Sequence, residues 1–175
     1  MVNSSRNYGL SLYSLANEEN ITKLIYDELK FVSEIISDNG EYIRILDSAA
    51  ISGEEKYSMI NNAFSGKVHS YIVNFIKILA GKRLMYTFSD CCNIFEKQYR
   101  SDNNIETITV TTAIELTGEE KERLLSSLSA KHKKTFIPSF TVNPEILGGI
   151  IINFENSHVD ASIKTQLNEI KRVIS

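Results

Sequence analysis

The residues best suited to catalysis or metal binding are few in this sequence and lie far apart. The three histidines are His69, His132 and His158, and none stands in an H-E-x-x-H pair or beside a cysteine pair, which are the local signatures of zinc sites. No G-x-S-x-G turn is present to expose a nucleophilic serine. We therefore expect histidines that lie on the surface, no metal site and no enzymatic activity.

The two cysteines, Cys91 and Cys92, are adjacent in a segment whose pattern predicts an amphipathic helix. Adjacent cysteines match no metal-ligand spacing, and two cysteines in 175 residues cannot form a disulfide framework. At least one of them should be a small residue of the core, which favours reduced thiols over a reactive nucleophile.

Two short segments invite a phosphate-binding or nucleic-acid-binding interpretation. Gly148-Gly149 belongs to neither phosphate-loop motif and precedes an expected strand, so we interpret it as a close backbone approach or a bulge. The basic run 131–134 lies at the expected end of a helix, where cations interact favourably with free carbonyl groups. With 19 Lys and Arg against 22 Asp and Glu, the net charge of −3 gives no general attraction to nucleic acid. We expect no cofactor.

The composition, 42% hydrophobic and 23% charged, is typical of a globular protein with one large or two small domains. The longest apolar run, 146–152, is far shorter than the ~18 residues that a membrane-spanning helix requires. The opening residues 1–7 resemble neither a signal peptide nor a transit peptide. We therefore expect the chain to remain in the compartment where it is made.

The first hundred residues show a helical hydrophobic period throughout. Apolar residues recur three and four apart between Ile21 and Ile36, and the Asn39-Gly40 pair ends that helix. Ser52 and Glu55 have the spacing of a capping box, which begins another helix. The pattern predicts a six-helix bundle, with helices over residues 8–16, 21–36, 42–46, 53–65, 67–80 and 83–100.

The pattern changes after the polar turn 101–104, where we place a domain boundary between residues 1–104 and 105–175. The second domain should be a small α/β domain of order β-α-β-β-α, so that the whole chain is an α+β protein. Pro138 favours an edge position or a bulge for its strand, and Asp160 is expected to cap the last helix. The expected strands are 105–113, 135–142 and 147–154, with helices that begin at Thr117 and Asp160. Because the domain is small, its stability should be marginal.

Two helices carry apolar residues over more than one face. On the helix 67–80 they cover an arc of roughly 160°, wider than the ~100° that one core face requires. On the first helix, Leu10 and Tyr13 point away from the expected inner stripe of Tyr8, Leu12 and Leu15. These arcs indicate either a groove for an amphipathic helix of a partner or a helix buried by its own neighbours, and periodicity alone does not choose.

Four segments resemble motifs of the delta subunit of F-type ATP synthases, whose mitochondrial counterpart is the oligomycin-sensitivity-conferring protein. Residues 8–16 resemble the Tyr-Ala-x-Ala-Leu-x-x-Leu-Ala pattern of its first helix, and residues 74–84 resemble its fifth helix and the start of its sixth. Residues 143–152 resemble the motif Asp-Pro-x-x-Leu-Gly-Gly, and residues 159–163 resemble Val-Ile-Asp-Gly-Ser-Val. The sequence departs from these patterns at Gly9, Asn143 and Ala161, where the family commonly has Ala, Asp and Gly.

The resemblance implies a stator subunit and not an enzyme. The N-terminal domain of such proteins binds the N-terminal helix of an alpha subunit in a groove between the first and fifth helices, and the C-terminal domain binds the peripheral-stalk b subunits. The catalytic head is thereby held against rotary torque during proton-driven ATP synthesis. The resemblance further implies one monomeric copy per complex at the cytoplasmic face of a bacterial plasma membrane, with membrane association only through the complex.

The groove that the resemblance implies has five candidate residues, which lie off the expected inner stripes: Leu10, Tyr13, Tyr71, Asn74 and Ile78. Two other classes of protein remain open at this point. One is a generic helical adaptor with an unrelated partner. The other is a small enzyme or nucleic-acid module in the α/β domain, which the missing motifs disfavour.

Overall fold

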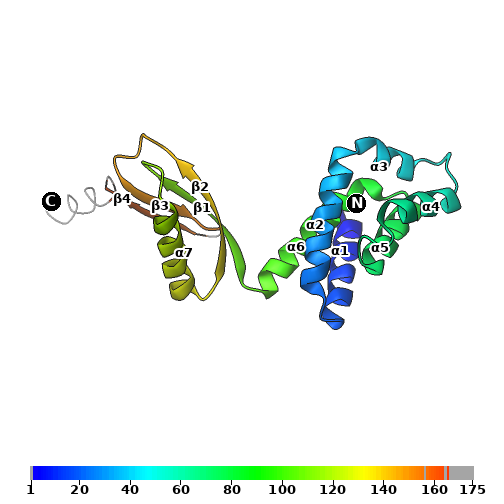
Figure 1. Ribbon diagram of the computed structural model, residues 1–175, viewed down its shortest axis with the longest axis horizontal. Coiled ribbons are helices and arrows are strands. Elements are labelled where there is room, and N and C mark those ends of the chain that lie inside the picture. Colours follow the sequence, from blue (N-terminus) through cyan, green and yellow to red (C-terminus); the bar gives the residue numbers. More distant parts are fainter. Residues whose placement is uncertain (1, 156, 164, 166–175) are drawn as a thin grey trace. The chain divides into compact units, whose positions relative to one another are not determined.

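The chain folds into two units of different architecture. The computed structural model describes residues 2–155, 157–163 and 165, and the side chains from Ser4 onward. The contacts divide the chain into Met1–Tyr99, here the helical unit, and Arg100–Ser175, here the sheet unit (Figure 1). The division falls within the last helix before the first strand, between Tyr99 and Arg100. It therefore lies a few residues before the polar turn 101–104, at which the sequence predicts a boundary.

Six α-helices precede the first strand, and each expected helix has a counterpart. Two begin later than the pattern predicts. The fifth starts only after Gly66, whose φ of 75° breaks the chain direction, and the sixth follows Arg83, whose φ of 55° is left-handed, and a short 3-10 turn. The bounds are α1 Val2–Glu18, α2 Thr22–Asp38, α3 Gly40–Asp47, α4 Gly53–Phe64, α5 Ser70–Gly81, the 3-10 turn Met85–Thr87 and α6 Phe88–Asp102.

The predicted capping box begins α4. The Glu55 amide donates to the Ser52 hydroxyl at 3.3 Å, and the Ser52 amide donates to the Glu55 carboxylate at 3.0 Å. These two bonds satisfy amides that have no partner within the first turn of a helix. The end of α2 is also confirmed, because Asn39 is its C-cap.

The core of the helical unit is continuous and largely apolar. On the inner face of α6, Phe88, Phe95 and Tyr99 are buried, and it is Cys91 rather than Cys92 that is fully buried. Five helices, α1, α2, α4, α5 and α6, each bury at least three side chains. The largest fully buried side chains of the helical unit are Phe88, Phe95, Ile25, Leu46, Ile60, Ile72, Ile76, Leu79, Met85 and Val32.

Among its described residues, the sheet unit contains the helix α7 and four strands. The elements are β1 Ile105–Thr112, α7 Gly118–His132, β2 Thr135–Val142, β3 Gly149–Asn153 and β4 His158–Ser162. The strand order is β2-β1-β3-β4, with β1 and β2 parallel and the other two pairs antiparallel. The edge position that Pro138 predicts for β2 is confirmed, since an edge strand can spare a backbone donor.

The helix α7 covers one face of this sheet. Figure 1 shows α7 lying against the strands, and its leucines pack on a small buried cluster. The cluster consists of Ile108, Val110, Phe136 and Ile152, with Leu124, Leu125 and Leu128 of α7 only partly buried against it. A capping box of Thr117 and Glu120 begins α7, as the sequence predicts.

The end of the sheet unit differs from the prediction. Asp160, expected as the cap of a last helix, lies inside β4, which the sequence analysis did not predict. Its carboxylate instead accepts bonds from the Ser162 amide at 2.8 Å and the Thr165 hydroxyl at 2.7 Å. Ser162 takes the capping position, because its hydroxyl accepts from the Thr165 amide at 3.4 Å. Most of the predicted helix, residues 166–174, lies outside the described residues.

Candidate partner-binding surface

The inner face of α1 is set by a close approach to α6. A Cβ added to Gly9 would lie 2.7 Å from the carbonyl oxygen of Cys91 and 3.0 Å from the side chain of Ile94. The absence of a side chain therefore lets the two helices meet at this point. The residues that α1 buries are Ser5, Gly9, Leu12, Tyr13 and Ala16.

Tyr13 consequently belongs to the core, and the prediction that it points away from the inner stripe is wrong. Its ring is 7% exposed and meets the ring of Phe95 edge-on, with the two centroids 5.3 Å apart. The reason is the phase of the helix, because Gly9 and not Tyr8 marks the line of contact with α6. The same shift turns Leu15, which was predicted to be internal, outward to 37% exposure.

The outer face of α1 carries a shallow hollow in which apolar and hydroxyl side chains alternate. Leu10, one of the predicted groove residues, is half-buried there beside the exposed Leu15. Leu15 was not among the predicted groove residues, because the pattern placed it on the inner stripe of the helix. Gly9 is the signal in the sequence that would have given the correct helical phase. The lining is Asn7, Leu10, Ser11, Ser14, Leu15 and Glu18.

The wide apolar arc of α5 resolves into a buried part and an exposed part. Most of its apolar residues are core, namely Ile72, Val73, Phe75, Ile76, Leu79 and Ala80. The predicted groove residues Tyr71, Asn74 and Ile78 follow one another at helical spacing on the outer side, where Tyr71 is half-buried and Asn74 is exposed. Ile78 is 48% exposed, which is unusual for an isoleucine on a helix that otherwise buries its apolar residues.

Hydrogen bonds at the start of α5 hold its outer side in place. The ring nitrogen Nδ1 of His69 accepts from the Tyr71 amide at 3.3 Å, and the two rings are 4.7 Å apart. The His69 amide in turn donates to the carboxylate of Glu28 on α2 at 2.6 Å. Tyr71 therefore lies in the first turn of a helix whose N-cap residue, His69, is tied to α2.

One contact joins α1 to the end of α5. The ammonium group of Lys82, the C-cap of α5, lies 5.4 Å above the ring of Tyr8. The structure thus brings the end of the helix that carries Tyr71, Asn74 and Ile78 to the helix that carries Leu10. It does not bring Tyr13 to that surface.

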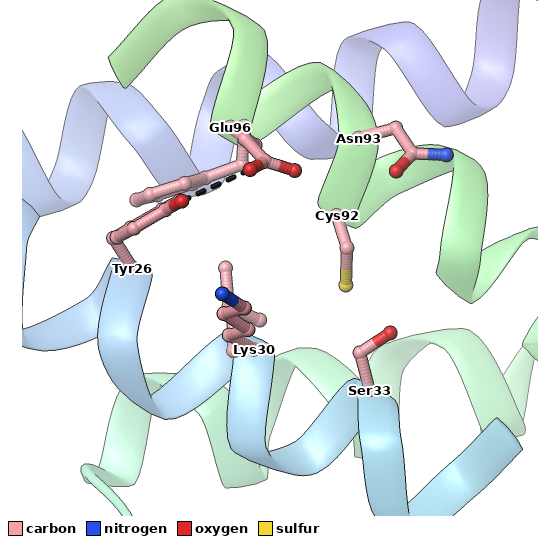
Figure 2. A pocket seen from close by; sticks show the side chains of 8 residues that line it. Tyr26, Lys30, Ser33, Cys92, Asn93 and Glu96 are labelled. Atoms are coloured by element: carbon pink, nitrogen blue, oxygen red, sulfur yellow. Dashed lines mark hydrogen bonds between the residues drawn. The ribbon is translucent and has the colours of Figure 1, made fainter. Parts of the chain in front are cut away.

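A polar cavity between α2 and α6 is lined by a thiol, a carboxylate and an amine, a combination that a catalytic site could use. Figure 2 shows Tyr26, Lys30 and Ser33 of α2 facing Cys92 and Glu96 of α6. The volume of about 70 Å³ is enough for water and too small for a substrate. Burial raises the pKa of the Cys92 thiol far above its ordinary value, and the nearby Cys91 and Glu96 raise it further. A thiol with a raised pKa is largely protonated near neutral pH and is therefore a poor nucleophile.

Among residues 2–155, 157–163 and 165, no three His, Cys, Asp or Glu side chains are grouped to hold a metal ion. Within the same residues no helix has the length and apolar content needed to cross a membrane.

The glycine pair of the sheet unit has the backbone role that the sequence predicts. Gly149 has φ of 90°, and a Cβ there would lie 2.5 Å from the carbonyl oxygen of Ala161 on β4. Gly148 has φ of 145°, and its Cβ would lie 2.7 Å from the side chain of Ile163. The pair therefore allows the start of β3 to lie close to β4, which is a role in the backbone and not that of a phosphate-binding loop.

Similarity to other proteins identifies the family to which the chain belongs. The family model described as ATP synthase delta (OSCP) subunit matches residues 5–174. The chain belongs to this family.

Individual relatives agree over nearly the full length. The ATP synthase subunit delta of Lachnoclostridium phytofermentans is 32% identical over 169 residues, which cover 96% of this chain and 93% of the relative. That of Clostridium kluyveri is 30% identical over 169 residues, covering 97% and 93%. A chain in the cryo-EM structure of the Toxoplasma gondii mitochondrial ATP synthase hexamer has the same fold, with a TM-score of 0.65 at 15% identity and coverage of 98% and 97%.

Members of the delta (OSCP) family are stator components of F-type ATP synthase, so this chain is a non-catalytic subunit of the peripheral stalk. It serves ATP synthesis and proton transport as a peripheral component of a membrane-bound complex. The raised pKa of Cys92 and the small volume of the polar cavity agree with that role.

Proposed function

We propose that the helical unit binds the N-terminal helix of an ATP synthase alpha subunit, and that the sheet unit binds the peripheral-stalk b subunits. One monomeric copy then links the catalytic head to the stalk at the cytoplasmic face of a bacterial plasma membrane. The corresponding domains are residues 1–104 and 105–175. The head is held by this link against the torque of the rotating central stalk.

The observation that carries the first half of the proposal is the exposed side of α5. Tyr71, Asn74 and Ile78 lie on it at the spacing with which one amphipathic helix meets another. Leu10 and Leu15 add apolar surface on α1, the helix that Lys82 joins to the end of α5. None of these five side chains is charged, so affinity should come from apolar anchors and depend little on salt.

The second half is supported by apolar residues around the sheet. Ile114 and Leu147 are 74% and 75% exposed, more than any other large apolar side chains of the described residues. Val142 and Val159, in strands β2 and β4, are about half exposed. Exposed apolar side chains of this size are expected where a stable partner covers them.

The first experiment is a titration of the full-length chain with a synthetic peptide of the ~20 N-terminal residues of the alpha subunit from the same organism. Amide NMR shifts should saturate and be confined to α1 and α5. Ile78→Asp, which places a charge among the anchors, should weaken the affinity by at least tenfold, and Leu10→Ala should weaken it less.

Leu24→Asp is the matched control, because Leu24 is exposed to a similar extent, 45%, on α2. It should leave the affinity for the peptide unchanged. If Ile78→Asp unfolds the helical unit at low temperature, Ile78 is part of the core; if neither helix shifts in the folded chain, α1 and α5 do not form the binding surface.

A further inference from the structure

A second apolar hollow lies on the helical unit, away from the surface proposed for the alpha subunit. It has a volume of about 360 Å³, which is within the range of small-molecule sites. Three helices contribute to it, so its walls are held by separate parts of the fold. The side chains that form it include Phe31 and Ile35 of α2, Tyr42 of α3, Ala63 and Phe64 of α4, and Lys67 in the turn after α4.

The apolar walls of this hollow are poorly covered. Phe31 is 48% exposed and Ile35 is 37% exposed, although α2 buries Ile25, Leu29, Val32 and Ile36 on its inner side. The rings of Tyr42 and Phe64 meet edge-on with centroids 6.3 Å apart. An apolar ligand would remove the exposed parts of Phe31 and Ile35 from water. Asn39 also lines the hollow, and its side-chain amide already donates to the Ile35 carbonyl oxygen at 2.8 Å.

The hollow has one charged residue, and its charge is positive. This residue is Lys67, and its ammonium group forms no ion pair with any residue that the structure describes. The Tyr42 hydroxyl is buried without a hydrogen-bond partner among the same residues, and burial raises its pKa, so Tyr42 adds no negative charge. An apolar surface with one free cation at its edge complements an apolar chain that ends in an anion.

We propose that this hollow binds a small amphipathic carboxylate, such as a fatty acid. The hydrocarbon chain lies along Phe31, Ile35 and Phe64, and the carboxylate pairs with the ammonium group of Lys67. Lys67 repels the head group of a cationic amphiphile, and a neutral amphiphile cannot form the ion pair, so both should bind less tightly than a carboxylate. The proposal concerns a site separate from α1 and α5, and it does not depend on the partners proposed above.

The test is an NMR titration of the full-length chain with octanoate, with octanol and octyltrimethylammonium as ligands of the same chain length. Octanoate should give saturable shifts confined to the ends of α2 and α4 and to α3, and should bind more tightly than the other two. Lys67→Gln should raise the Kd of octanoate roughly three- to fivefold and leave that of octanol unchanged. Lys23→Gln, a lysine exposed elsewhere on α2, is the matched control and should change neither.

Two further variants separate the walls from the charge. Ala63→Phe should fill the hollow and abolish binding of octanoate and octanol alike, whereas Tyr42→Phe should retain both, because its hydroxyl is buried. Thermal unfolding checks that each variant is folded. The proposal is overturned by shifts that do not saturate, by shifts spread over both units, by equal affinity for octanoate and octanol, or by preferential binding of an amphipathic peptide at α2–α4.

Discussion

The two units stabilise themselves in different ways. In the helical unit, α2, α4, α5 and α6 each bury between three and six side chains. In the sheet unit, α7, all of whose residues the structure describes, buries none fully, and the apolar cluster beneath it has four buried members. Among the residues that the structure describes, the helical unit therefore has a large core beneath its exposed anchors, whereas the core of the sheet unit is small.

This difference bears on the role of a stator. A tether under torque must not deform, and a well-packed helical core resists deformation, which suits the binding of the head that we propose for the helical unit. The sheet unit leaves large apolar side chains such as Ile114 and Leu147 exposed. Covering them with a partner would add the stability that its own core lacks.

The largest expected effect comes from matched deletions in the two cores. Phe136→Ala in the sheet unit and Phe95→Ala in the helical unit should each cost about 3–5 kcal/mol. A domain as small as the sheet unit rarely has more than about that amount to lose, so Phe136→Ala should unfold it while Phe95→Ala leaves a folded but weakened helical unit. Amide NMR spectra of the full chain report both units together. Survival of the sheet unit in Phe136→Ala would remove the contrast.

A second, somewhat smaller effect is expected at the glycine pair. Gly149→Ala should destabilise the sheet unit by about 3 kcal/mol, because the new Cβ meets the backbone of β4 and the residue keeps a positive φ. Gly148→Val should also destabilise it, since its φ is unfavourable and its neighbour is the side chain of Ile163. Gly118→Ala, which has open space around it, is the control. An unchanged unfolding midpoint in Gly148→Val would reopen the question of a ligand site there.

The smallest effect concerns the capping boxes, of which each unit has one. Thr117→Ala and Ser52→Ala should each cost about 1 kcal/mol near pH 7. Because the matched cost is a larger share of a marginal stability, Thr117→Ala should lower the unfolding midpoint of the sheet unit more than Ser52→Ala lowers that of the helical unit. Equal shifts of the two midpoints would weaken the comparison.

The same capping boxes predict a pH dependence. Bonds from Ser52 hold the pKa of Glu55 below its ordinary value of 4.5, and bonds from Thr117 do the same for Glu120. A carboxyl whose pKa is lowered on folding stabilises the fold above pH 4.5, and that contribution is lost as the pH falls through the lowered value. Urea unfolding between pH 6 and 3 should therefore show a weaker acid dependence in Thr117→Ala than in the parent chain.

Signals that are local in sequence predicted the structure well. Ser52 with Glu55 and Thr117 with Glu120 begin helices because the side chain and the amide that it satisfies lie within one turn. Pro138 predicts an edge strand for the equally local reason that it lacks a donor.

Features that depend on distant contacts were harder to predict. The phase of α1 follows from the approach of Gly9 to α6, some eighty residues later, so Tyr13 and Leu15 exchange their expected sides. Asp160 looks like a helix cap from its neighbours, but pairing with β3 makes it part of a strand. Of the five predicted groove residues, Tyr71, Asn74, Ile78 and Leu10 keep exposed or half-buried positions, which periodicity alone could not have separated from core.

The central claim, that the two units hold two different partners, is tested most directly by an assembly measurement. The full chain is mixed with the purified catalytic head and with the soluble part of the b subunits, and the complexes are separated by sedimentation. We predict a complex of all three, from which Ile78→Asp removes the head and retains the b subunits. Loss of both partners in the folded variant, or retention of the head, would contradict the account.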